Sequence, residues 1–172
     1  MKKHALLLIL FLSASSLMPA FAAEETPPPT DEMQRLVDAG QFQEAYDTAQ
    51  ANIRLWEGSE PRFDFLYGLA ALESGDPNEA VFALERATTT SANGVMRERA
   101  RLELARAYFV TNNLNAAENL FNVVLENNPP ANVRQNIEAF LQLIDTRRSS
   151  QAPTANWSIA TVVGSDDNIN SA

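Results

Sequence analysis

A short segment that recurs at a nearly constant spacing limits the fold of this chain more than any other feature. Residues 40–45 (GQFQEA) are echoed 35 positions later by residues 75–80 (GDPNEA), and after a further 37 positions by residues 112–117 (NNLNAA). Each copy lies between two amphipathic helical stretches, so each is predicted to be the tight turn of a helical hairpin. Hairpins of this length bury their apolar faces only by stacking, which predicts an all-α fold of stacked hairpins.

These residues resemble the tetratricopeptide repeat, a helix–turn–helix unit of about 34 residues. The residues in the family's register are Tyr67, Gly68, Gly75, Ala80 and Ala87, followed by Leu104, Ala105, Tyr108, Ala117, Phe121 and Pro129. Small residues at these positions let paired helices approach closely, while the larger ones fill the gaps between them. Two features depart from the pattern: Asn112 replaces the turn glycine, and residues 88–94 lengthen one connection. The resemblance covers residues 31–129 and implies about three hairpins.

The two ends of the repeat region differ from its middle. Three prolines at positions 27–29 leave only a short first helix, over residues 31–39. After the last repeat, residues 132–148 predict one more helix, with its apolar residues on a single face: Val133, Ile137, Phe140, Leu141 and Ile144. Such a helix would cap the open apolar edge of the last repeat. The predicted helical domain is therefore residues 31–148.

The first residues have the pattern of a secretory signal peptide. A basic start with Lys2 and Lys3 precedes an apolar run, and Ala20-Phe21-Ala22 supplies a cleavage site, which predicts a leader over residues 1–22 and a Pro-rich linker over residues 23–30. The alternative, an uncleaved anchor, is disfavoured because the apolar run is shorter than the roughly 20 residues that span a bilayer. The leader is of bacterial style, so we expect the protein in the periplasm.

The last residues carry a second pattern. After a linker at residues 149–156, large and small side chains alternate over residues 157–164, beginning with Trp157. This alternation suits the first strand of an outer-membrane barrel, although an edge strand or an unpaired tail would look similar. Residues 129–141, Trp157 and residues 164–172 together resemble the junction of the surface lipoprotein assembly modifier family. Residues 157–172 would then begin a truncated barrel, and the chain would be an N-terminal fragment or the product of a truncated gene.

That resemblance implies a function in moving lipoproteins or related proteins across the outer membrane. The helical domain would be a periplasmic interaction module whose partner is a protein or peptide client, with a lipoprotein as one candidate. The missing barrel would tether it to the outer membrane. Two alternatives stay open: a scaffold in polysaccharide export, and a stand-alone periplasmic scaffold in envelope assembly.

The composition argues against catalysis and against nucleic acid as a partner. Cysteine is absent, and the only His and Lys residues are His4, Lys2 and Lys3, all within the predicted leader. The mature chain would lack an imidazole base, a thiolate and an amine nucleophile, so we expect a protein that is not an enzyme and needs no cofactor and no metal. Its 11 Arg stand against 22 Asp and Glu, a balance that repels nucleic acid.

The resemblance also places candidate binding residues on the first helix of each repeat, which lines the concave side of the stack. These partner-binding candidates are Arg62, Phe65 and Leu69 in the second repeat, and Arg99, Leu102, Arg106 and Phe109 in the third. The arginines could recognise carboxylates, and the apolar residues could hold the side chains of a peptide. Alternatively, these arginines pair with glutamates at helical spacing, as Glu98 could with Arg101 and Glu103 with Arg99 and Arg106.

Overall fold

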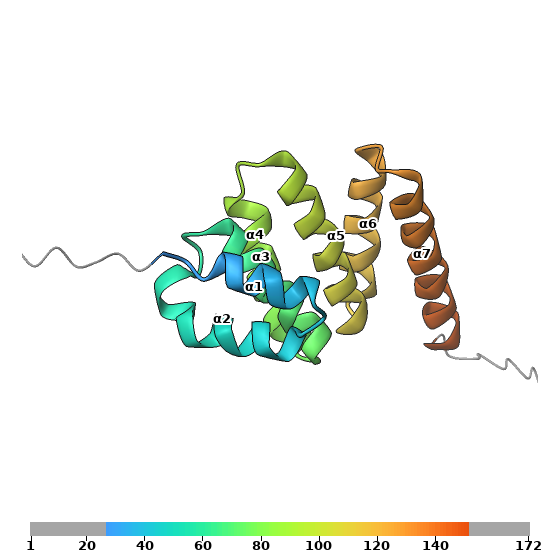
Figure 1. Cartoon of the computed structure of the whole chain (residues 1–172). Helices are drawn as coiled ribbons and strands as arrows, with labels where there is room; N and C mark the ends of the chain where they lie inside the picture. The colour runs from blue at the N-terminus through green and yellow to red at the C-terminus, as the bar shows by residue number, and fades with distance from the viewer. Residues whose placement is uncertain (1–26, 152–172) are drawn as a thin grey trace, which may run out of the picture.

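The computed structural model describes residues 27–151, and this part of the chain is built from helices alone (Figure 1). The helices are α1 (Thr30–Asp38), α2 (Phe42–Trp56), α3 (Pro61–Ser74), α4 (Pro77–Thr90), α5 (Gly94–Val110), α6 (Leu114–Glu126) and α7 (Ala131–Gln151). Three hairpins, α1/α2, α3/α4 and α5/α6, follow one another along the stack, and α7 closes its end. The prediction of an all-α fold of about three hairpins is confirmed. The leader, residues 23–26 of the Pro-rich linker and the predicted strand at 157–172 lie outside the described residues.

The three recurring turns share one backbone geometry. Gly40, Gly75 and Asn112 all have positive φ, at 74°, 92° and 61°. The residue after each donates its N–H to a carbonyl five residues back, over 2.8 Å, 2.9 Å and 2.8 Å respectively. This is the Schellman arrangement that ends a helix at a left-handed residue. Asn112 can replace glycine there because asparagine is among the few residues that adopt this conformation readily.

Small residues bring the helices into close contact, as predicted. A Cβ atom on Gly68 of α3 would lie 2.5 Å from Cγ of Leu84 in α4, so only glycine fits at this crossing. The predicted alanines at this kind of position are all fully buried: Ala80, Ala87, Ala105 and Ala117. Tyr67 and Phe121 fill the spaces between them. The core is therefore continuous along the stack, with Tyr108 and Leu120 contacting both of its parts.

Helix α7 packs through the predicted face. Ile137 and Ile144 are fully buried, and the Phe140 ring stacks on Phe121 with 5.2 Å between centroids. The helix continues three residues past the predicted end at Arg148, into the predicted linker that begins at residue 149. The Ser149 hydroxyl donates to the carbonyl of Asp145 over 2.9 Å, which lets a residue of low helix propensity continue the helix.

A buried ion pair, which the sequence did not reveal, joins α3 to α4. Asp64 is fully buried and accepts hydrogen bonds from Nε of Arg86 and the backbone N–H of Gly58, both at 2.9 Å. Burial raises the pKa of Asp64, and the bonds from Arg86 and Gly58 act in the opposite direction. The pair therefore ties the α2–α3 connection to α4.

Candidate partner-binding groove

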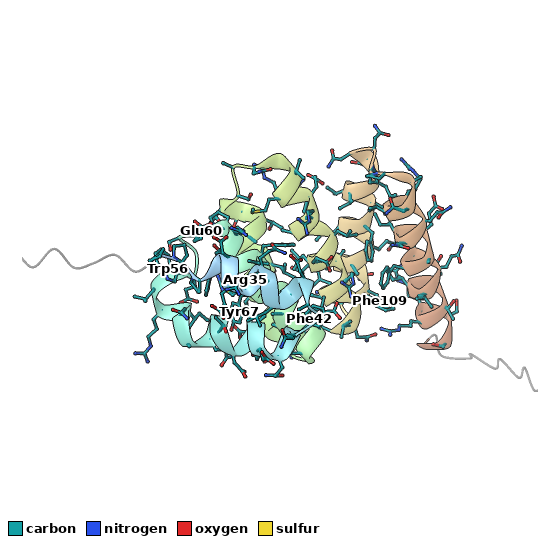
Figure 2. All side chains as sticks on the ribbon, viewed as in Figure 1. Arg35, Phe42, Trp56, Glu60, Tyr67 and Phe109 are labelled. Atoms are coloured by element: carbon teal, nitrogen blue, oxygen red, sulfur yellow. The ribbon has the colours of Figure 1, made fainter. Side chains whose placement is uncertain are left out.

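A groove runs between α5 and α7 and consists of two adjoining cavities that share Leu102 and Glu103. The larger cavity, about 490 Å³, is bordered by the first half of α5, the α6–α7 connection and the start of α7. The smaller, about 330 Å³, lies further along α5 and α7. Both α5 and α7 are upright at one end of the stack, with Phe109 near the lower end of α5 (Figure 2).

The walls of the groove are mainly apolar. The larger cavity is lined by Val95, Leu102, Val124, Pro129, Pro130 and Val133, and the smaller by Leu102, Ala139, Phe140 and Leu143. Two of these side chains reach far into solvent, since Val95 is 73% and Leu143 50% exposed. Exposed apolar side chains around a concavity are typical of a surface that another molecule covers.

The carboxylates at the groove are already paired. Arg106 is held between Glu103 and Glu73, with 2.7 Å from its Nη2 to the Glu73 carboxylate. Glu98 accepts from Arg101 at 2.6 Å and from the Asn127 amide at 3.0 Å. Burial raises the pKa of Glu103, although the charge of Arg106 acts to lower it. Each of these carboxylates therefore contacts an arginine, with Glu73 and Glu103 sharing Arg106.

Arg99 is placed differently from Arg106. Its guanidinium carbon lies 5.1 Å from the centre of the Phe65 ring, so the planar group is held by a cation–π contact with α3. Arg99 is exposed and forms no ion pair with any residue in the described range 27–151, although its charge acts on Glu103 at longer range. Its N–H groups are available to a ligand at the edge of the larger cavity.

The structure brings together part of the predicted set of binding residues. Arg99 and Leu102 line the larger cavity, Leu102 and Arg106 line the smaller one, and the Phe65 ring contacts the Arg99 guanidinium. The remaining predicted residues lie elsewhere: Arg62, Leu69 and Phe109 are not among the residues lining either cavity. A role in binding stays a prediction for all seven.

The displaced residues have other contacts. Arg62 pairs with Asp31 of α1 at 2.7 Å. Phe109 is 7% exposed and packs edge-on against Phe140, with Arg147 stacked 3.9 Å from its centre. Leu69 is half-buried against the main core. The alternative prediction of glutamate pairing is confirmed at Glu98–Arg101 and Glu103–Arg106.

The wall that α7 contributes to the groove was not predicted from the sequence. Asn136, Ala139 and Leu143 lie off the core face of that helix and line the smaller cavity. A signal was present, because Ala139 and Leu143 are four residues apart and therefore share a second strip of the helix. The prediction of α7 as a capping helix considered only its core face, so this second strip was not identified as a binding surface.

Neither a metal cluster nor a membrane-spanning helix is found within residues 27–151. No group of three or more His, Cys, Asp or Glu side chains is arranged there to hold a metal ion. In the same part of the chain, every helix is too short or too polar to cross a bilayer.

Comparison with known proteins agrees with this geometry. Residues 71–139 match the family model of the tetratricopeptide repeat. This stretch runs from the end of α3 to Ala139 in α7, so it includes the α5 wall of the groove and the first part of the α7 wall. The predicted tetratricopeptide repeat is confirmed for that stretch. None of the comparisons supports the more specific resemblance to the surface lipoprotein assembly modifier family, which stays a prediction.

Two solved structures share the fold. Both are of SycD, the type III secretion translocator chaperone of Yersinia enterocolitica, and one contains a peptide of the translocator YopD. The first aligns with a TM-score of 0.58 at 16% identity, covering 70% of this chain and 83% of SycD. The complex aligns with a TM-score of 0.57 at 16% identity, covering 69% and 91%. Identity this low shows a shared fold only. A search of curated protein sequences found no match.

Proposed function

We propose that this tetratricopeptide-like domain is a non-catalytic module that binds a peptide segment of another protein between α5 and α7. One observation carries the proposal: an apolar groove with two open cavities lies between these helices, and no described residue covers it. Its lining includes Leu102 and the half-exposed Leu143. Burying such side chains under a partner would contribute about 25 cal/mol per Å² of apolar area. A helical or extended peptide is the kind of ligand that fits a long groove between helices.

The fold comparison supports the same class of function. SycD, whose structure contains a translocator peptide, has a similar fold over most of its length. The composition of this chain also favours binding over chemistry, since His and Lys occur only within residues 1–22 and Cys is absent.

A display selection tests the proposal. Random peptides are selected on the immobilised chain, and the enriched peptides are measured by fluorescence anisotropy. Leu143→Glu places a charge in the groove and should weaken binding at least tenfold. Phe82→Glu is the matched control, because Phe82 is also an exposed apolar residue, 58% against 50%, but lies on α4 outside the groove. Equal loss in both variants, or none in either, would refute the groove as the site.

We also propose that the chain acts in the periplasm, as part of a factor that exports lipoproteins or related proteins across the outer membrane. The support comes from the sequence: the leader pattern at residues 1–22 and the junction-like residues 129–141, 157 and 164–172. An immunoblot of cell fractions with an antibody against the helical domain tests this. An outer-membrane band that changes mobility on heating is expected, whereas a cytoplasmic band would contradict both the compartment and the export role.

A further inference from the structure

If one apolar side chain of a partner fills each cavity of the groove, the spacing of the cavities determines the distance between those two side chains. Val133 lines the larger cavity and Phe140 the smaller, and they are seven residues apart on α7, or about 10.5 Å along its axis. Side chains seven apart on a helical peptide match this distance. So do side chains three apart in a polyproline II segment, which rises about 3.1 Å per residue and repeats every three.

Arg99 adds a charge requirement at one end of the same groove. It borders the larger cavity but not the smaller, so a partner group that meets it must lie beside the first apolar side chain. The contact with Phe65 holds the guanidinium plane and leaves its hydrogen-bonding edges open.

Each of the surrounding acids already contacts an arginine other than Arg99. Glu98 is paired with Arg101, and Glu103 and Glu73 are both paired with Arg106. Two arginines line the cavities. Arg106 forms ion pairs, whereas Arg99 forms none within residues 27–151. The chain as a whole carries a formal charge of −9, so one acid at Arg99 is favoured where a generally acidic partner would be repelled.

We propose that the partner is a peptide segment with two bulky apolar side chains about 10 Å apart, and one carboxylate next to the first of them that binds Arg99. This inference rests on the proposed function and specifies its ligand. The apolar side chains occupy the two cavities, and the carboxylate accepts hydrogen bonds from the Arg99 guanidinium at the edge of the larger one.

Two biased display libraries test the proposal. One fixes two leucines three residues apart and the other fixes them seven apart. In both, the positions flanking the first leucine encode an equal mixture of Glu and Gln. Selection on the wild-type chain should enrich Glu over Gln about three- to tenfold, the range of one partly exposed charge-assisted contact. Selection on Arg99→Gln should return a ratio near one.

Arg54→Gln is the matched control, because Arg54 is an exposed arginine of α2 outside the groove and should leave the Glu preference unchanged. Arg99→Lys keeps the charge but loses the planar fork, so an intermediate preference is expected. Thermal melts of these variants should stay within about 5 °C of the wild type, because both arginines are exposed and Arg99 loses only a surface cation–π contact with Phe65.

The outcomes separate this inference from the proposed function. Peptides that bind, lose affinity with Leu143→Glu and show no Glu preference would overturn the carboxylate contact alone. Failure to enrich any groove-dependent peptide would overturn both. Tighter peptide binding after removal of residues 157–172 would identify this chain's own apolar segment as the occupant and overturn the proposed partner. A dimer in light scattering that dissociates in the Leu143→Glu variant would identify a second copy of the chain as the occupant. That result would also overturn the proposed partner.

Discussion

The contact between α3 and α4 and the contact between α5 and α7 show two outcomes of stacking helices from the same repeat. At the first, Gly68 allows Leu84 to approach so closely that a single added carbon would collide with it. At the second, Leu102 is only half-buried, Leu143 is 50% exposed, and two cavities separate the helices. Both regions are rich in leucine, so side-chain hydrophobicity alone does not distinguish them.

The difference lies in the facing residues and in the number of neighbours. The helices α3 and α4 form one hairpin, joined by a two-residue turn and by small residues at the crossing. The helices α5 and α7 are separated by α6, and α7 has no further helix behind it within residues 27–151. Close packing stabilises the first region, whereas the second keeps apolar surface that a partner can bury. Four experiments would break or sharpen this comparison.

The largest effect is expected from truncating a leucine in each region. Leu84→Ala should lower the free energy of unfolding by about 3 kcal/mol, because Leu84 is fully buried and leaves a cavity. Leu143→Ala should change it by less than about 0.5 kcal/mol, since the side chain is half exposed. Urea unfolding followed by circular dichroism measures both. Similar losses for the two variants would mean that the groove is part of the packed core.

The ion pair at the closed contact should matter next. Asp64→Ala leaves Arg86 with a poorly compensated charge, and a loss of about 2 kcal/mol is expected after allowing for the 27% exposure of the Arg86 side chain. The control is Asp31→Ala, which removes an ion pair of similar length to Arg62 but from a carboxylate that is 90% exposed. No resolvable change in the unfolding midpoint is expected for the control.

A double-mutant cycle tests the close approach itself. Gly68→Ala should destabilise the protein by about 1 to 2 kcal/mol, because the clash with Leu84 outweighs the higher helix propensity of alanine. In the Leu84→Ala background the same change should be close to neutral, since the two nearest atoms are gone. Additive effects of the two substitutions would show that another contact makes glycine necessary.

The smallest stability effect is expected where volume is added to the open region. Ala139 is exposed and lines the smaller cavity, so Ala139→Leu should change the free energy of unfolding by less than about 0.5 kcal/mol. The added side chain should nevertheless occupy the cavity and weaken binding of the selected peptides several-fold in anisotropy titrations. A stability loss like that of Gly68→Ala would show that α5 and α7 are in closer contact than this structure indicates.

Much of the fold could be predicted because its signals are local. The turn residues Gly40, Gly75 and Asn112 determine a left-handed backbone within a few positions of themselves. The small residues and the apolar face of α7 are read from helical periodicity, which depends on neighbours three and four positions away. Even the pairing of Glu103 with Arg106 is local in this sense.

The site depended on contacts between distant parts of the chain. Arg106 also binds Glu73, 33 positions away, and Arg62 binds Asp31, 31 positions away. These pairs decide that Arg106 is neutralised and that Arg62 lies outside the groove, while the stacking of Arg99 on Phe65 leaves Arg99 available. No periodicity within one helix specifies which residue of another helix will face it.

The sequence by itself determined the helices, their turns and the positions where backbones meet closely, because each depends on the conformational preferences of neighbouring residues. Only the tertiary structure decided where the stack stays open. The angle and spacing of α5 and α7 arise from the packing of all the helices between and beneath them, and this packing turns Leu102, Ala139 and Leu143 into the walls of one groove.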